Sequence, residues 1–238
     1  MFNWFKRLNL LSAGPVKPAR SGRTGLVFGL IFGLICLFPV VGFSGQGLFD
    51  FDAALLERVE KKYDKAAVKR LKDLTALVKN NAKGSELDRV KYANDFFNKV
   101  PYYSDIVHWK KKDYWATPLE KLATHGGDCE DYAIGKYFAL RELGVEQKKL
   151  RIMYVKAIEW NEAHMVLTYF PKENEIPLVL DNINKKLLPA NKRKDLVPVY
   201  SFNAEGLWLA KARGTGKRVG SSSKIKLWAD LQNRMQDF

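Results

Sequence analysis

The residue of this chain best placed for covalent chemistry is a cysteine that follows two glycines. Cys129 lies in the run Gly126-Gly127-Asp128-Cys129-Glu130-Asp131-Tyr132, and the pattern after it predicts a helix over residues 129–143 that Gly144 closes. A thiol at the start of a helix lies at the positive end of the helix dipole, which favours the thiolate that attacks carbonyl carbons. A cysteine at such a position is more often a small apolar core residue, but here the glycines leave the thiol unobstructed.

Two later residues complete a candidate catalytic triad. His164 lies in an apolar, strand-like segment, and Asp181 follows the apolar run 178–180. Taken singly, the histidine reads as a packed core residue and the aspartate as a turn residue. In the order Cys, His, Asp they fit a nucleophile, a general base and acid, and a carboxylate that orients the imidazole. Triads are defined by geometry rather than by chain order, so the structure has to test this prediction.

Three carboxylates flank the cysteine, on Asp128, Glu130 and Asp131. Acids in a first helical turn are often simple helix caps. Around a nucleophile, however, they oppose formation of the thiolate unless something neutralises them. Oxygen ligands at this density suit Ca²⁺, although the spacing is not that of an EF-hand. His108 and His125 lack metal-site spacing with one another, and we predict that both are structural.

Composition and charge limit the classes of partner. The chain has 238 residues, of which 47% are hydrophobic, and a formal net charge of +14. Part of the basic excess precedes residue 25 and part lies near the C-terminus, for example in the run 192–194. Such surfaces attract nucleic acid, anionic lipid or acidic proteins. Because no basic motif interleaved with aromatic residues is present, we expect no nucleic-acid partner.

The N-terminal segment indicates export from the cytoplasm. Residues 25–43 are apolar, basic residues precede them, and Gly42-Phe43-Ser44 offers small residues for cleavage. We predict a signal peptide over 1–44; an uncleaved membrane anchor is the alternative. The remainder, 45–238, is predicted to be one domain. After cleavage Cys129 would be the only cysteine and therefore free of an internal disulfide.

The remaining patterns predict helices before strands. Apolar residues at helical spacing predict one long helix from Leu55 to near Gly84, and a second that starts at Ser85 and stops at Pro101. Residues 101–127 read as a loop with short turns. Strands are expected at 151–156, 164–170, 178–180 and 196–200, then a flexible loop over 214–223 and a final helix capped by Ser223. This order indicates an α+β fold, with the cysteine helix packed against an antiparallel sheet that carries His164 and Asp181.

Several segments make the sequence similar to a known family. They are residues 113–118 (Asp-Tyr-Trp-Ala-Thr-Pro), 127–134 (Gly-Asp-Cys-Glu-Asp-Tyr-Ala-Ile) and 140–145 (Leu-Arg-Glu-Leu-Gly-Val), and the similarity continues through 163–167 and 180–182. Over about residues 50–238 the chain resembles the bacterial transglutaminase-like cysteine proteinases, in particular their adhesin-processing type. The acidic frame around the cysteine distinguishes this type from transglutaminase-like domains in general.

The resemblance implies a papain-like, transglutaminase-like fold, with a helical N-terminal lobe packed on a sheet lobe, and calcium-dependent endoproteolysis in the periplasm. It implies Cys129, His164 and Asp181 as the triad, and Asp128, Glu130 and Asp131 as calcium ligands. The implied substrate is the N-terminal region of a large cell-surface adhesin, cut next to small residues so that a biofilm disperses. An inner-membrane receptor for cyclic di-GMP is expected to sequester the protease.

Two other functions remain open from the sequence. A transglutaminase-type acyltransferase would use the same thiol and acyl-enzyme but resolve it with an amine instead of water. A non-enzymatic alternative is a calcium-stabilised binding module for a membrane receptor, which the intact set of Cys129, His164 and Asp181 disfavours.

Overall fold

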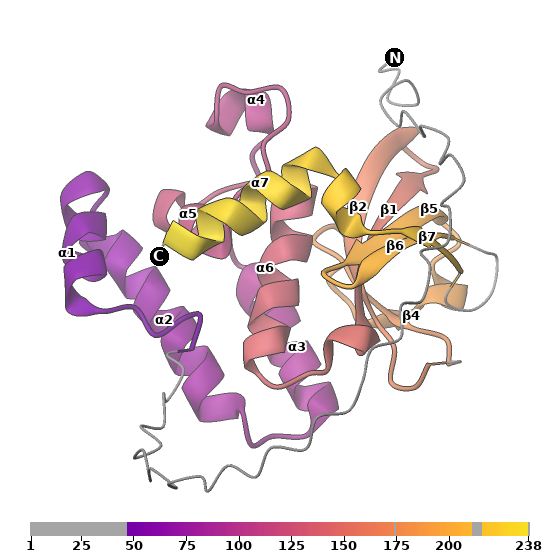
Figure 1. Ribbon diagram of the computed structural model, residues 1–238, viewed down its shortest axis with the longest axis horizontal. Coiled ribbons are helices and arrows are strands. Elements are labelled where there is room, and N and C mark those ends of the chain that lie inside the picture. The colour runs from indigo at the N-terminus through magenta and orange to yellow at the C-terminus, as the bar shows by residue number, and fades with distance from the viewer. Residues whose placement is uncertain (1–46, 174, 211–215, 238) are drawn as a thin grey trace, which may run out of the picture. The chain divides into compact units, whose positions relative to one another are not determined.

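Most of the helices precede a single sheet, and a final helix follows it, in the computed structural model, which describes residues 47–173, 175–210 and 216–237 (Figure 1). The α-helices are α1 (Ala53–Lys62), α2 (Lys65–Asn81), α3 (Glu86–Phe97), α4 (Asp105–His108), α5 (Pro118–Thr124), α6 (Cys129–Glu142) and α7 (Lys226–Arg234), with short 3₁₀ helices at Gln147–Lys149, Ala190–Lys192, Ser222–Lys224 and Met235–Asp237. The strands are β1 (Leu150–Ala157), β2 (Glu162–Tyr169), β3 (Leu178–Leu180), β4 (Leu188–Pro189), β5 (Leu196–Asn203), β6 (Gly206–Leu209) and β7 (Lys217–Gly220).

The helix predicted from Leu55 to Gly84 is two helices, so that prediction was wrong in part. α1 ends at Lys62 and is capped by Tyr63, and the carboxylate of Asp64 accepts the backbone N–H of Ala67 to start α2. Aspartate is a strong N-cap because its side chain satisfies a backbone donor that the helix itself leaves unpaired. The apolar period continues across the break, which is why periodicity alone did not find it.

The loop predicted over 101–127 also contains helix, most clearly α5. Thr117 and Glu120 form a reciprocal capping box around Pro118, the first residue of α5. This short helix ends at His125, whose left-handed backbone turns the chain into Gly126. The local structure therefore delivers the chain directly to the start of α6, which begins at Cys129 as predicted.

The described strands form one sheet in the order β4-β3-β2-β1-β5-β6-β7, and every neighbouring pair is antiparallel. The four predicted strands are present, which confirms the α+β class. The prediction of a flexible loop over 214–223 is wrong for Lys217–Gly220, because these residues form β7. Residues 211–215, which include the start of the predicted loop, lie outside the described residues. The final helix is confirmed, but it starts after Ile225 with no side-chain cap, so Ser223 does not cap it.

Helix α6 lies between α2 and the sheet (Figure 1). It packs against α3 and α5 and against β1 and β2. Its residues Ile134 and Leu140 are fully buried, and complete burial of such side chains stabilises a fold by about 1.5–3 kcal/mol each. The ring of Phe97 occupies the space where Gly135 lacks a Cβ, so α3 approaches α6 closely. This packing holds the start of α6 in a fixed position relative to β2.

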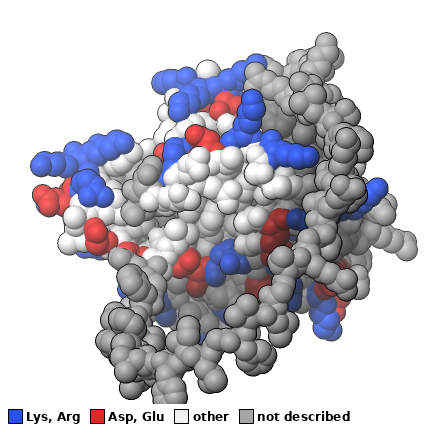
Figure 2. Space-filling view, in the orientation of Figure 1, with Lys and Arg blue, Asp and Glu red and all other residues white. Residues whose placement is uncertain are grey.

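The predicted signal peptide, residues 1–44, lies outside the described residues. Within the part of the chain that the structure describes, no helix combines the length and apolar character needed to cross a lipid bilayer. On the face drawn in Figure 2, Lys and Arg side chains lie in separate groups around a largely uncharged area. The basic excess is therefore spread over several places on this face.

Candidate active site

Cys129 occupies the first turn of α6, and the preceding glycines shape the backbone there. Gly127 has φ of 152°, a conformation that side chains disfavour, and an added Cβ would overlap the carboxylate of Asp131. At Gly126 an added Cβ would meet Tyr103 and His108 at 2.6 and 2.7 Å. Both glycines are therefore required by close packing, and the thiol itself is half-buried.

His164 and Asp181 form a buried pair, although they lie 17 residues apart in the sequence. Nε2 of His164, on β2, is 2.9 Å from Oδ1 of Asp181, which follows β3 directly. The backbone N–H of Ile183 donates to the same oxygen at 3.0 Å, and Asn98 Nδ2 donates to the Asp181 carbonyl at 2.9 Å. The carboxylate is thus held from several sides in the orientation that fixes the imidazole ring.

The thiol lies beside the strand that carries the histidine. α6 packs against β2, and the backbone N–H of Met165, the residue after His164, is near enough to the Cys129 sulfur to act on the pKa of its thiol, which it lowers. Because Asp181 engages Nε2, the ring nitrogen left for the thiol is Nδ1. The fold thus brings the sequence-predicted Cys129, His164 and Asp181 to one region, where α6 meets β2.

Burial of Asp181 by itself would raise the pKa of its carboxyl. The hydrogen bond and charge of His164, the Ile183 N–H and the Arg193 guanidinium together outweigh burial and hold that pKa well below its usual range. Asp181 is therefore an ionised acceptor, so Nε2 of His164 carries the proton that lies between them.

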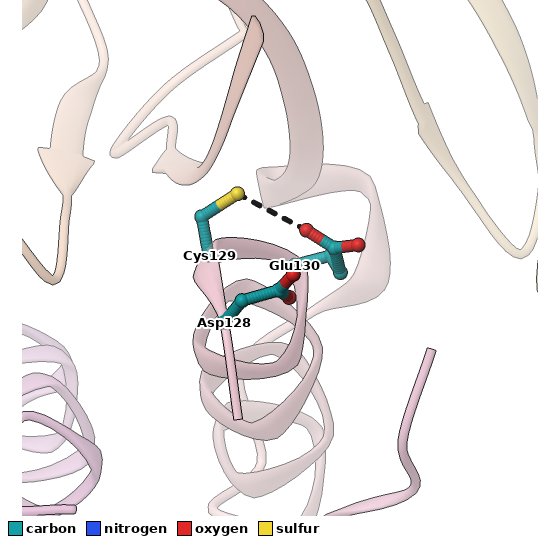
Figure 3. A group of neighbouring side chains, drawn as sticks. All are labelled: Asp128, Cys129 and Glu130. Atoms are coloured by element: carbon teal, nitrogen blue, oxygen red, sulfur yellow. Dashed lines mark hydrogen bonds between the residues drawn. The ribbon is translucent and has the colours of Figure 1, made fainter. Parts of the chain in front are cut away.

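The carboxylates of Asp128 and Glu130 lie beside the thiol (Figure 3), and further acids join this cluster. Sγ of Cys129 is 3.0 Å from Oε2 of Glu130. Asp105, Asp113 and Glu130 each offer an oxygen within 4.8 Å of the other two, and so do Asp105, Asp128 and Asp131. Asp105 and Asp113 were not predicted. Asp113 begins the 113–118 segment that carries part of the family resemblance, but its residue type gave no metal signal on its own.

The acidic cluster strongly perturbs its own ionisation. Burial, with the charge of Glu130, raises the pKa of Asp128 to about 10. Burial, with the charge of Asp131, raises the pKa of Glu130 to about 7, and burial raises that of Asp105 to about 6. Burial and the charges of Glu130 and Asp128 raise the pKa of the Cys129 thiol well above its usual value. Without a cation the cluster thus favours the thiol over the reactive thiolate.

The donors present fit a calcium ion. Among the described residues, Asp105 Oδ1 and Asp128 Oδ1 are buried and have no hydrogen-bond partner. Such atoms are costly unless something binds them. Asp105 shares one group of potential ligands with Asp113 and Glu130, and Asp128 shares another with Cys129 and Glu130. These overlapping groups offer hard oxygen donors, the chemistry that Ca²⁺ selects.

Asp131 is bonded differently from the other acids. Its Oδ1 accepts the Ala116 N–H at 2.7 Å and its Oδ2 accepts the Asp128 N–H at 3.3 Å. The buried ammonium of Lys121 lies nearby and interacts electrostatically with Asp131: an added Cβ on Gly127 would overlap Asp131 Oδ2 and lie 2.9 Å from Lys121 Nζ. The carboxylate of Asp131 thus joins the start of α6 to the chain before α5. The sequence-based assignment of Asp131 as a calcium ligand stays a prediction.

The two other histidines lie outside the acidic cluster. His108 Nε2 is 2.8 Å from the Thr124 hydroxyl, and its ring stacks on Tyr103 at 5.6 Å. His125 is exposed and ends α5. Neither belongs to the groups of potential metal ligands found among the described residues.

The chain is similar to a known family and to solved structures. The family model for the bacterial transglutaminase-like cysteine proteinase BTLCP matches residues 59–210. The solved structure of Legionella pneumophila LapG is 40% identical, with 76% of this chain and 97% of that chain covered and a TM-score of 0.66. EGTA-treated LapG of the same organism gives the same identity and coverage with a TM-score of 0.67. Calcium-bound LapG is 39% identical, with 78% and 99% covered and a TM-score of 0.66.

A search of curated proteins found no match. The family model spans well over half of the chain, and the LapG structures share about two-fifths of the aligned residues with it. The cysteine that opens α6 lies inside the matched region, as do the histidine on β2 and the aspartate after β3. The chain belongs to the bacterial transglutaminase-like cysteine proteinases.

Proposed function

We propose that the chain is a calcium-dependent cysteine endopeptidase of the LapG type, with Cys129, His164 and Asp181 as its triad. The observation that carries the proposal is the meeting of α6 and β2. There a thiol at a helix start lies beside the strand of a histidine that is held by a buried, ionised aspartate. Nucleophile, base and orienting group are the three parts that acyl transfer to a thiol requires.

In the proposed mechanism the Cys129 thiol gives its proton to Nδ1 of His164, and the sulfur attacks the carbonyl carbon of the scissile peptide. The backbone N–H at the start of α6 stabilises the oxyanion that forms. The imidazolium, stabilised by Asp181, then protonates the leaving amine, and a thioester remains on Cys129. His164 next takes a proton from water, whose oxygen attacks the thioester carbon. The bond between this carbon and the sulfur breaks, the acid product leaves, and the imidazolium returns the proton to the Cys129 sulfur.

We further propose that calcium binds to Asp128 and Glu130, together with Asp105 and Asp113. When bound, the cation supplies positive charge that offsets the repulsion between these carboxylates and the thiolate. The buried, unpartnered oxygens of Asp105 and Asp128 support this assignment. So does the existence of calcium-bound and EGTA-treated structures of the similar Legionella LapG.

The substrate proposal rests on the family resemblance. We propose that the enzyme acts in the periplasm on the N-terminal region of a large surface adhesin, next to small residues such as a pair of alanines. Release of the adhesin would disperse a biofilm. An inner-membrane receptor for cyclic di-GMP is the proposed regulator that holds the protease back.

The test is cleavage of a purified adhesin N-terminal fragment that contains an Ala-Ala pair. With Ca²⁺ we expect two fragments whose masses sum to the substrate plus one water; with EGTA or with Cys129→Ala we expect none. An adduct of higher mass in the presence of amines would instead identify an acyltransferase. If Cys129→Ala cleaves as fast as the unchanged chain, the assignment of the nucleophile is wrong.

A further inference from the structure

Behind the histidine–aspartate pair lies a buried arginine that no step of the proposed mechanism uses. Nη2 of Arg193 donates to Oδ2 of Asp181 at 2.7 Å, the oxygen that His164 does not contact. The side chain of Arg193 is only 3% exposed and that of Asp181 is fully buried. In the sequence this arginine belongs to a basic run, 192–194, that reads as solvated surface charge.

A second carboxylate fixes the arginine in turn. Nε of Arg193 is 2.9 Å from Oδ1 of Asp195, and Nη2 is 2.6 Å from its Oδ2, the paired geometry that a guanidinium makes with a carboxylate. The carbonyl of Asp195 also accepts the N–H of Ile158 at 2.8 Å. Ile158 begins the turn between β1 and β2, so this contact ties Arg193 to the hairpin that carries the catalytic histidine.

We propose that Arg193 is a positioning residue for the reaction: held by Asp195, it fixes the carboxylate of Asp181 in the orientation that holds the His164 ring. The inference rests on the proposed triad. The function requires an arginine because one planar guanidinium bonds Asp181 and Asp195 at once, whereas a lysine ammonium offers a single point charge.

The other charged group that faces Asp181 is on α6. Lys136 is fully buried, interacts electrostatically with Asp181, and has its pKa lowered to about 7 by burial. Its Nζ has no hydrogen-bond partner among the described residues, so it exerts a field on Asp181 without fixing its orientation. Arg193 therefore provides the directed contact, while His164 bonds the opposite oxygen.

The experiment compares Arg193→Gln, Arg193→Lys and Asp195→Asn in the full chain with Ca²⁺. Lys194→Gln is the matched control, because Lys194 is exposed in the same segment. One readout is the imidazole N–H signal of His164 in ¹⁵N-histidine-labelled protein; the chain has only three histidines, and His164→Gln assigns the signal. The other readout is kcat/KM for the adhesin fragment as a function of pH.

For Arg193→Gln we expect the His164 signal to shift or broaden, because the carboxylate of Asp181 loses the partner that holds its Oδ2. We expect kcat/KM to fall by about 10- to 100-fold, less than for loss of the histidine. Removing the positive charge also raises the pKa of Asp181, so the acid limb of the pH profile moves to higher pH. Arg193→Lys should restore the acid limb of the pH profile but only part of kcat/KM. Asp195→Asn should lower kcat/KM less than Arg193→Gln does. Lys194→Gln should change neither the His164 signal nor kcat/KM.

The outcomes separate this inference from the proposed function. If Arg193→Gln keeps the histidine signal, the acid limb and kcat/KM of the unchanged chain, the inference is wrong even though Cys129→Ala is inactive. A lower melting temperature with unchanged signal and pH profile also overturns it, since that result indicates a structural role only. If instead Cys129→Ala remains active, the triad fails, and the NMR signal still reports whether Arg193 orients the His164–Asp181 pair.

Discussion

Nε2 of His164 lies 2.9 Å from Oδ1 of Asp181, and both side chains are buried behind the surface where α6 meets β2. The low pKa of Asp181 makes this carboxylate an acceptor at any pH near neutrality. The hydrogen bond therefore selects one tautomer of the neutral ring, with the proton on Nε2 and the lone pair on Nδ1. That tautomer is the one able to take a proton from the thiol.

Replacement of these two residues should have graded effects. His164→Gln removes the base, and we expect kcat/KM to fall by several orders of magnitude. Asp181→Asn keeps the shape but removes the charge that stabilises the imidazolium, so we expect a large but smaller loss. The measurement is steady-state cleavage of the adhesin fragment, with folding checked by circular dichroism. Asp181→Asn with full activity would show that the carboxylate is only structural.

Cys129→Ala should abolish cleavage while the protein still folds and binds calcium. The thiol is half-buried, and its removal leaves the hydrogen bonds of Asp131 to Ala116 and to the Asp128 N–H in place. Isothermal calorimetry with Ca²⁺ and thermal unfolding would check this expectation. Loss of folding together with activity would mean that the residue's packing, rather than its chemistry, explains its place in α6.

The sequence predicted the elements that carry the triad because their signals are local. Glycines bound α6 at both ends, and short apolar runs mark β2 and β3. The remaining partners could not be predicted, since their roles depend on contacts across the fold. Arg193 lies in a run of basic residues that resembles any solvated surface, and only the long-range approach of Asp181 shows that it is buried.

The same reason applies to the acidic cluster. Asp105 and Asp113 lie in a segment where the sequence predicted a loop, far from the cysteine along the chain. The segment folds back because Asp105 accepts the Tyr114 N–H and Tyr103 donates its N–H to the Gly127 carbonyl. Periodicity reports neither contact, so the sequence indicated only the three acids adjacent to the thiol.

Asp105→Asn and Asp113→Asn should each weaken calcium binding, even though neither residue is near Cys129 in the sequence. Each change removes a charged oxygen ligand from the proposed site. We expect a higher Kd for Ca²⁺ by calorimetry and a higher Ca²⁺ concentration for half-maximal cleavage. Glu57→Gln, an exposed acid on α1, is the control. An unchanged Kd in both variants would remove the two aspartates from the ligand set.

Calcium binding should become tighter as pH rises. Without metal, burial and mutual repulsion raise the pKa of Asp128 to about 10, of Glu130 to about 7 and of Asp105 to about 6. At pH 6 these carboxyl groups hold protons that calcium must displace, so calcium binding releases protons into solution. At pH 8 fewer of the carboxyl groups are protonated, so calcium has fewer protons to displace. Calorimetry in buffers of different ionisation enthalpy measures the release directly. Equal Kd values at pH 6 and pH 8 would contradict the prediction.

Gly127→Ala should damage the site through the backbone. At φ of 152° an L side chain is strained by about 1–3 kcal/mol, and the new Cβ would overlap the Asp131 carboxylate that holds the start of α6. We therefore expect a lower melting temperature and, in the protein that still folds, weaker calcium binding and slower cleavage. The matched control is Gly84→Ala in the loop before α3, where the new Cβ would meet its nearest atom at 3.4 Å. If both variants unfold at the same temperature and cleave at the same rate, the close approach of Gly127 and Asp131 does not support the active site.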